Sequence, residues 1–225
     1  MKLILAVGAF AFAFPFFSPS VFAQAAKDVA VVLKAQGQVR VNRSQNGAVE
    51  SARAGTRLHD GNLLRTGEES LAALVFTDDK SILKVRSNSK LAIAGQREDS
   101  GILKTIKMEF GQLWAKVTRS SSPFRIETPS GVAAVKGTVF YCLFDHAGNM
   151  IICCLEGAVE LSNKMGKVLV KAGYTGICTE NQEPTSRPST PSEVPAWGSE
   201  GNESGKLEIE LQDANGQKKK LLLQY

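Results

Sequence analysis

Short runs of alternating apolar and polar residues follow one another between Asp28 and Cys178. Alternation with a period of two places one face of a strand against a core and the other face toward solvent. Turn-forming Gly, Asn, Asp or Ser residues interrupt these runs about every 8 to 12 residues, a rhythm typical of sandwiches, barrels and β-solenoids. The clearest runs span residues 29–33, 38–41, 71–77, 81–86, 90–94, 102–110, 112–117 and 167–171. The pattern predicts a single all-β domain, solenoid-like or sandwich-like.

The stretch from residue 123 to residue 161 is the most apolar part of this region. Val139–Phe144 and Met150–Leu155 are apolar throughout and flank a predicted turn at residues 145–149. Continuous apolar runs of this length indicate strands that are buried on both faces. Gly137, a lone glycine among β-branched neighbours, indicates a backbone position where a Cβ would cause strain. We therefore expect this stretch to form the buried centre of the domain.

The N-terminal segment Met1–Ala23 has the composition of a signal sequence. It carries one charge, at Lys2, followed by an apolar run and the small-x-small ending Val21-Phe22-Ala23. These features predict a cleaved secretory signal and a mature protein in the periplasm or outside the cell. The alternative is an uncleaved anchor, but the run is short for a span of about 20 residues and contains prolines. After cleavage we expect no integral membrane segment.

The composition changes again after residue 180. Residues 181–205 are rich in Pro, Ser, Thr, Glu and Gly, which predicts a flexible linker. The pattern of residues 206–225 predicts a C-terminal β-hairpin, with an alternating strand at 206–211, a turn at 213–216 and a second strand from Lys218. A hairpin alone is marginally stable in water, so it should dock on the main domain or on another molecule.

Charge and reactive residues point away from several functions. The chain has 27 Lys and Arg against 22 Asp and Glu, scattered along the sequence, which argues against nucleic-acid binding. A nucleophilic pairing of His146 with Cys153 or Cys154 is conceivable, but no third orienting group is apparent. Asp78-Asp79 could suggest a cation site, yet a calcium site needs several more oxygen ligands. We predict no enzyme activity, no metal and no cofactor.

The four cysteines, Cys142, Cys153, Cys154 and Cys178, suggest disulfides in an exported protein. A turn centred on Ala147-Gly148 would place Cys142 opposite Cys153, and Cys154 would then lie on the other face, within reach of Cys178. A shift of one residue would instead pair Cys142 with Cys154. Buried, reduced cysteines that pack as small apolar residues are the alternative.

Three blocks carry a likeness to a known family. The first consists of Ala54–Leu58, Gly61–Gly67 and Leu74–Ser81, and the second is Phe110–Trp114. The third consists of Phe124–Pro129, Val135–Phe140 and Leu155–Val159. In order and spacing these blocks resemble the FecR (ferric-citrate regulator) domain family over roughly residues 28–178. The motif residues are Gly61, Arg65, Thr66, Gly67, Gly111, Thr128, Pro129, Lys136, Gly137, Thr138, Phe140 and Gly157.

The resemblance implies a non-catalytic periplasmic domain that contacts the signalling portion of an outer-membrane receptor. The chain departs from the family at three places: the family usually has Gly-Asp at Gly61-Asn62, Asp-Gly-Ser at Asp79-Lys80-Ser81, and Arg-Gly-Thr at Lys136-Gly137-Thr138. The regulators of this family also begin with a cytoplasmic helical segment that handles a sigma factor, followed by a membrane helix. We expect neither segment here, because a signal sequence stands at the start.

Three classes of function are consistent with these features. The first is an exported protein-binding or envelope sensing and signalling module, with a protein partner in the cell envelope. The alternatives are an envelope scaffold or a thiol- or carbohydrate-directed enzyme. The candidate partner-binding residues are Trp197, Leu207, Ile209, Leu211, Lys218, Lys219 and Lys220, which lie in the linker and the hairpin.

Overall fold

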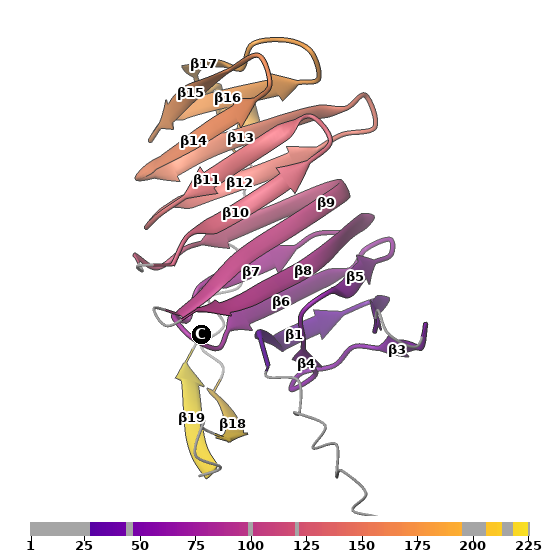
Figure 1. Cartoon of the computed structure of the whole chain (residues 1–225). Coiled ribbons are helices and arrows are strands. Elements are labelled where there is room, and N and C mark those ends of the chain that lie inside the picture. The colour runs from indigo at the N-terminus through magenta and orange to yellow at the C-terminus, as the bar shows by residue number, and fades with distance from the viewer. Residues whose placement is uncertain are drawn as a thin grey trace, which may run out of the picture.

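The computed structural model describes residues 28–43, 47–98, 101–119 and 122–194, together with the paired backbones of residues 206–212 and 218–224. The first 17 strands form one continuous mixed sheet that folds over itself into two layers (Figure 1). All strand pairings in the described part are antiparallel except that between β9 and β10. The predicted all-β fold is confirmed, and no barrel closes.

The two layers have separate strand orders and share one strand. Layer A contains, in spatial order, β4 (Arg57–Leu58), β1 (Ala30–Gln36), β6 (Leu71–Phe76), β7 (Ile82–Val85), the second half of β9 (Gly101–Lys116), β12 (Val139–Phe144), β13 (Asn149–Glu156), β16 (Tyr174–Thr179) and β17 (Thr185–Pro188). Layer B contains β3 (Val49–Ser51), β2 (Val39–Asn42), β5 (Asn62–Thr66), β8 (Ser89–Glu98), the first half of β9, β10 (Phe124–Thr128), β11 (Gly131–Val135), β14 (Ala158–Asn163) and β15 (Gly166–Lys171).

From β6 onward the chain contributes hairpins to the two layers in turn. The hairpins β6–β7, β12–β13 and β16–β17 belong to layer A, and β10–β11 and β14–β15 belong to layer B. Alternate residues of each strand point between the layers and bury there, as the sequence pattern predicted. The rings of Phe76 and Phe124, one from each layer, meet edge to face with centroids 5.6 Å apart. One hydrophobic core therefore runs along the whole stack.

Strand β9 joins the layers where the sequence suggested two separate strands. Its first half pairs with β8 and β10, and its second half pairs with β7 and β12. The change of layer follows a bend at Gly111, where an added Cβ would lie 2.2 Å from Ser89 Oγ. The Ser89 hydroxyl also accepts a hydrogen bond from the backbone N–H of Gln112 at 3.0 Å. A residue with a side chain would push the two strands apart at this point.

The predicted cysteine pairing is wrong. Cys142 lies opposite Ile152, Tyr141 lies opposite Cys153, and all four cysteines are buried and free. The loop of the β12–β13 hairpin is one residue longer than expected, because Asp145 pairs with Asn149 and Gly148 adopts a φ of +83°. Glycine in this left-handed conformation is typical of three-residue hairpin loops with a bulge. The extra loop residue shifts the pairs from Phe140 to Phe144 by one position, and an irregularity between Val139 and Phe140 leaves Val139 opposite Glu156.

The ordered domain extends past the predicted boundary at residue 178. Strand β17 and a 3-10 helix, Pro191–Glu193, lie inside the segment predicted to be a linker. They are ordered because β17 pairs with β16 and Glu193 forms an ion pair with Arg187. The predicted C-terminal hairpin is confirmed in its backbone, since β18 (Lys206–Gln212) pairs with β19 (Lys218–Gln224). The predicted signal sequence lies outside the described residues.

Candidate protein-interaction surface

Among the described residues, each layer ends in a strand that has only one neighbour, and these open edges differ in length and in cover. At one end of the stack, β3 and β4 are short. At the other end, β17 carries Pro188, and the chain that follows folds back as the 3-10 helix. Strand β15 has six residues and pairs with β14 along its whole length. Of these edges, β15 offers the longest regular strand.

Local sequence fixes the position of β15. The turn that joins it to β14 is formed by Asn163-Lys164-Met165-Gly166, and the Asn163 side-chain oxygen accepts hydrogen bonds from the backbone N–H groups of Met165 and Gly166 at 2.8 and 3.2 Å. The amide nitrogen of Asn163 donates to the carbonyl oxygens of Thr179 and Gln182 at 3.1 and 2.7 Å. One side chain thus shapes the turn and ties the end of layer B to layer A.

The hydrogen-bonding groups at the outer edge of β15 follow from the turn. A two-residue loop makes Asn163 and Gly166 a hydrogen-bonded pair, so the pairs alternate from there along the hairpin. The backbone N–H and C=O groups of Lys167, Leu169 and Lys171 consequently point away from β14, toward the open edge. Unpaired groups of this kind can accept an additional strand from another chain.

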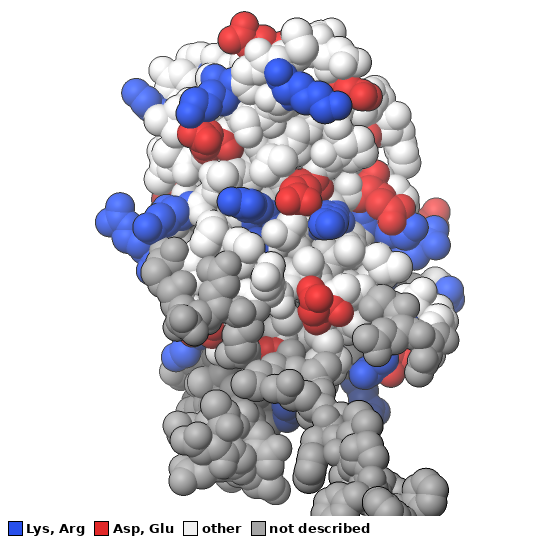
Figure 2. Space-filling view, viewed as in Figure 1, with Lys and Arg blue, Asp and Glu red and all other residues white. Residues whose placement is uncertain are grey.

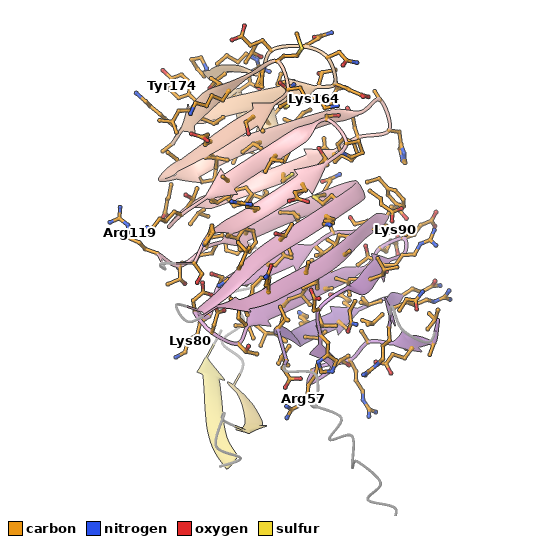
Figure 3. The ribbon with its side chains drawn as sticks, in the orientation of Figure 1. Arg57, Lys80, Lys90, Arg119, Lys164 and Tyr174 are labelled. Atoms are coloured by element: carbon orange, nitrogen blue, oxygen red, sulfur yellow. The ribbon has the colours of Figure 1, made fainter. Side chains whose placement is uncertain are left out.

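Exposed apolar side chains gather at the same end of the molecule. Leu169 is 52% exposed, Met165 is 57% exposed and Tyr174, which begins β16, is 40% exposed. Lys164 and Tyr174 lie at this end of the stack, among the side chains of β14 to β17 (Figure 3). We call Met165, Lys167, Leu169, Lys171 and Tyr174 the β15 edge. The flanking lysines keep the edge soluble, a usual protection for an open strand.

Three threonines of the sequence motif form hydrogen bonds at the corners of the fold. The Thr66 hydroxyl donates to Arg86 O at 2.5 Å, and Thr138 Oγ1 donates to Ala158 O at 2.9 Å. Thr128 Oγ1 donates to Gly131 O at 3.2 Å across the turn that contains Pro129. Gly137 adopts a φ of +67°, as its sequence context suggested. All these groups are satisfied within the domain.

Asp78 and Asp79 form ion pairs with Lys104. The Lys104 ammonium lies 2.6 Å from Asp78 Oδ2 and 2.5 Å from Asp79 Oδ2, and the residue is completely buried. Asp78 also accepts a hydrogen bond from Ile102 N, and Asp79 accepts one from Ser81 N. The buried position of Lys104 could have been predicted from the sequence, because Lys104 alternates in phase with the core residues of its strand. No group of metal-ligating side chains occurs within the described ranges.

The structure does not bring together the possible cysteine–histidine pair. His146 lies in the β12–β13 loop, and its ring is 5.6 Å from that of Phe110. Cys153 and Cys154 lie at the far end of β13, opposite Tyr141 and Phe140. Cys153 lies four residues along the extended strand from Asn149, which corresponds to about 13 Å. The candidate binding side chains from Trp197 to Lys220 lie outside the described residues.

Comparison with known proteins agrees with these observations. Residues 62–160 match the FecR protein family. Residues 62–160 form a FecR domain. Two crystal structures of a "putative anti-sigma factor" from Parabacteroides distasonis ATCC 8503, at 2.50 and 1.65 Å resolution, share the fold of this chain with a TM-score of 0.52 and 16% identity. The match covers 67% of this chain and 67% or 68% of the other. No curated protein sequence matches the chain significantly.

Two departures from the FecR motif have a structural explanation. Lys80 adopts a φ of +60° in the β6–β7 turn, the conformation that the usual glycine of the family takes without strain. Asn62 Oδ1 accepts a hydrogen bond from His59 N at 3.0 Å, a role that the usual aspartate could also perform.

Within the described residues, no helix is long and apolar enough to cross a membrane.

Proposed function

We propose that this protein is a non-catalytic FecR-type module of the cell envelope that binds a partner protein along the β15 edge. The partner would add an extended segment to layer B, next to β15. The observation that carries the proposal is the open six-residue edge with the half-exposed Leu169 between two lysines. The predicted signal sequence supports a location outside the cytoplasm, and the FecR domain supports a role in signalling.

The chemistry of the β15 edge defines the partner segment. Backbone groups supply affinity in strand addition, and alternate side chains supply specificity. Leu169 offers an apolar contact, and Lys167 and Lys171 offer positive charge on either side of it. A segment with an apolar residue between acidic residues would complement this edge. The Lys167 ammonium already lies 3.6 Å from Glu160, which shows that the outer face of β15 accommodates a carboxylate.

A photo-crosslinking residue at position 169 of the exported, full-length protein tests the proposal in the native cell. Crosslinking from residue 169 should yield a discrete product in the envelope fraction. The matched position is Ala134, which lies on the outer face of layer B in the middle of the sheet. No product at residue 169, or the same product from residue 134, would contradict binding at the edge.

Proline substitutions then separate strand addition from simple surface contact. Leu169→Pro removes an N–H that points to the open edge, where proline is tolerated, so the domain should remain folded and lose the partner. Val168→Pro removes an N–H that bonds to β14 and should destabilise the hairpin. Circular dichroism reports folding, and crosslinking from Tyr174 reports binding. Full partner binding by a folded Leu169→Pro variant would exclude strand addition.

A further inference from the structure

The outer face of layer A, which points away from the core, is mainly apolar, although Lys84 and Lys116 also lie on it. On β1 and β6, Val31 lies directly opposite Val75, and Ile82 on β7 continues this row. In the next row, Trp114 on β9, Tyr141 on β12 and Cys153 on β13 lie opposite one another. A sheet face of this composition is normally covered by another layer of structure.

Several of these outward side chains are nevertheless buried. Val31 is 1% exposed, Val75 3%, Tyr141 6% and Cys153 3%, although none of them belongs to the core between the layers. At the C-terminal end of the face, the cover is the chain that follows β17. Ser189 Oγ lies 3.5 Å from Cys153 Sγ and 2.9 Å from Thr175 Oγ1, and Glu193 Oε2 lies 3.3 Å from Thr175 Oγ1.

A local ion pair holds this returning segment. Arg187 donates hydrogen bonds to Glu193 Oε2 at 2.9 Å and Oε1 at 2.5 Å, and Glu193 Oε2 also accepts from Thr190 N at 2.8 Å. The hydrogen bonds from Arg187, followed by that from Thr190, lower the pKa of Glu193 to about 2. Residues 189–193 thus lie over the outer face, and the described chain reaches Val194 at the edge of this mainly apolar surface.

We infer that the C-terminal segment, residues 195–225, packs on the outer face of layer A and covers it. The segment starts at this face and contains Trp197 and the alternating apolar residues Leu207, Ile209 and Leu211. The 11 residues from 195 to 205 can extend about 36 Å. The distance from β16 to β1 is six strand spacings, or about 29 Å. The hairpin β18–β19 can therefore reach Val31 and Val75, and it needs an apolar surface to be stable.

This inference gives the hairpin a place on its own domain, in contrast to the hypothesis that it binds the partner. It is independent of the β15 edge, which belongs to layer B at the opposite end of the stack from β1. The other possible occupants of the face are a second copy of the chain and a partner protein. Each of these occupants predicts a different experimental result.

Trp197 fluorescence in the full-length Trp114→Phe variant tests the inference, because the chain has two tryptophans. A packed Trp197 should emit at shorter wavelength than a free tryptophan derivative and should resist acrylamide quenching. Ile151→Asp, on the outer face of layer A, should shift the emission to longer wavelength and increase quenching. Ala134→Asp, on the outer face of layer B, should change neither. Emission like that of free tryptophan in the folded parent variant would overturn the inference.

A second measurement covers the case in which Ile151→Asp unfolds the domain. A protease site inserted between Gly201 and Asn202 is cut after folding, and the mixture is separated by gel filtration with light scattering. The fragment with residues 202–225 should elute with the domain at monomer mass. Release of the fragment would overturn packing of the hairpin. A dimer mass that falls on dilution together with Trp197 protection would identify a second copy as the occupant and overturn the inference as well.

Discussion

The two layers differ in the charge on their outer faces. Layer B has charged residues on its outer face, where Arg40, Arg65 and Lys90 lie directly opposite one another on neighbouring strands. Figure 2 shows Lys and Arg interspersed with Asp and Glu on the face that β8, β10, β11 and β14 present in Figure 1. Layer A has mainly apolar residues in the corresponding positions. Layer B is therefore a sheet with one solvated face, whereas layer A has mainly apolar residues on both faces.

The difference shows which layer must be covered and which can remain open. Opposed like charges destabilise a strand pair, but solvent screens them when the face is exposed. Lys90 also forms an ion pair with Glu109 at 2.6 Å on this face. An apolar outer face has no such compensation and must bind something. The proposed partner would thus bind the edge of layer B, whereas the apolar residues on the outer face of layer A are more stable when they are covered.

The largest expected effect concerns Lys104, the one lysine that layer B directs into the described core. Lys104→Ala leaves the carboxylates of Asp78 and Asp79 without their cation, so we expect a loss of about 3 to 5 kcal/mol in the free energy of unfolding. Denaturant titration measures it. Lys107→Ala removes a lysine from the exposed face of the same strand and should change stability by less than about 0.5 kcal/mol. Equal effects of the two substitutions would contradict the assignment of Lys104 to the core.

The labelling rates of the cysteines provide a comparison of the two faces of layer A. Burial raises the pKa of the Cys142 thiol, and burial followed by the charge of Cys153 raises the pKa of Cys154 to about 11. Both lie in the core, so their labelling by a thiol reagent should require global unfolding. Cys153 lies on the outer face beneath Ser189, and a local release of residues 189–193 would expose it.

We therefore expect Cys153 to be labelled much faster than Cys142 at low denaturant concentration. Peptide mass spectrometry after timed labelling gives both rates in one sample. Cys178, a core cysteine whose Sγ lies 3.0 Å from Ser130 O, serves as the internal control and should follow Cys142. Identical rates for Cys153 and Cys142 would mean that the outer face opens only when the whole domain unfolds. Fewer than four reactive thiols in the unfolded, unreduced protein would reveal a disulfide.

The sequence predicted the strands well, because alternation reports burial on one face directly. It also predicted that Val139–Phe144 and Met150–Leu155 are buried on both faces. It did not show which hairpin joins which layer, since that depends on corners such as the bend at Gly111. The register of β12 and β13 was missed because one additional loop residue is invisible in an apolar pattern. The β15 edge was missed because its exposure depends on where the stack ends.

The smallest expected effect concerns Lys84 on the outer face of layer A. Its ammonium lies 4.9 Å from the centroid of the Trp114 ring, and desolvation, followed by the charge of Lys34, lowers its pKa from 10.5. Between the lowered pKa and 10.5 the unfolded chain binds more protons at this position than the folded chain, so stability rises with pH in this window. Lys84→Met removes this contribution. As pH rises toward 10.5, the melting temperature of the variant should therefore decrease relative to that of the wild type. The matched variant Lys107→Met removes a lysine from the exposed outer face of layer B and serves as the control. If both variants follow the wild type in parallel, the outer face of layer A is as hydrated at Lys84 as layer B is at Lys107.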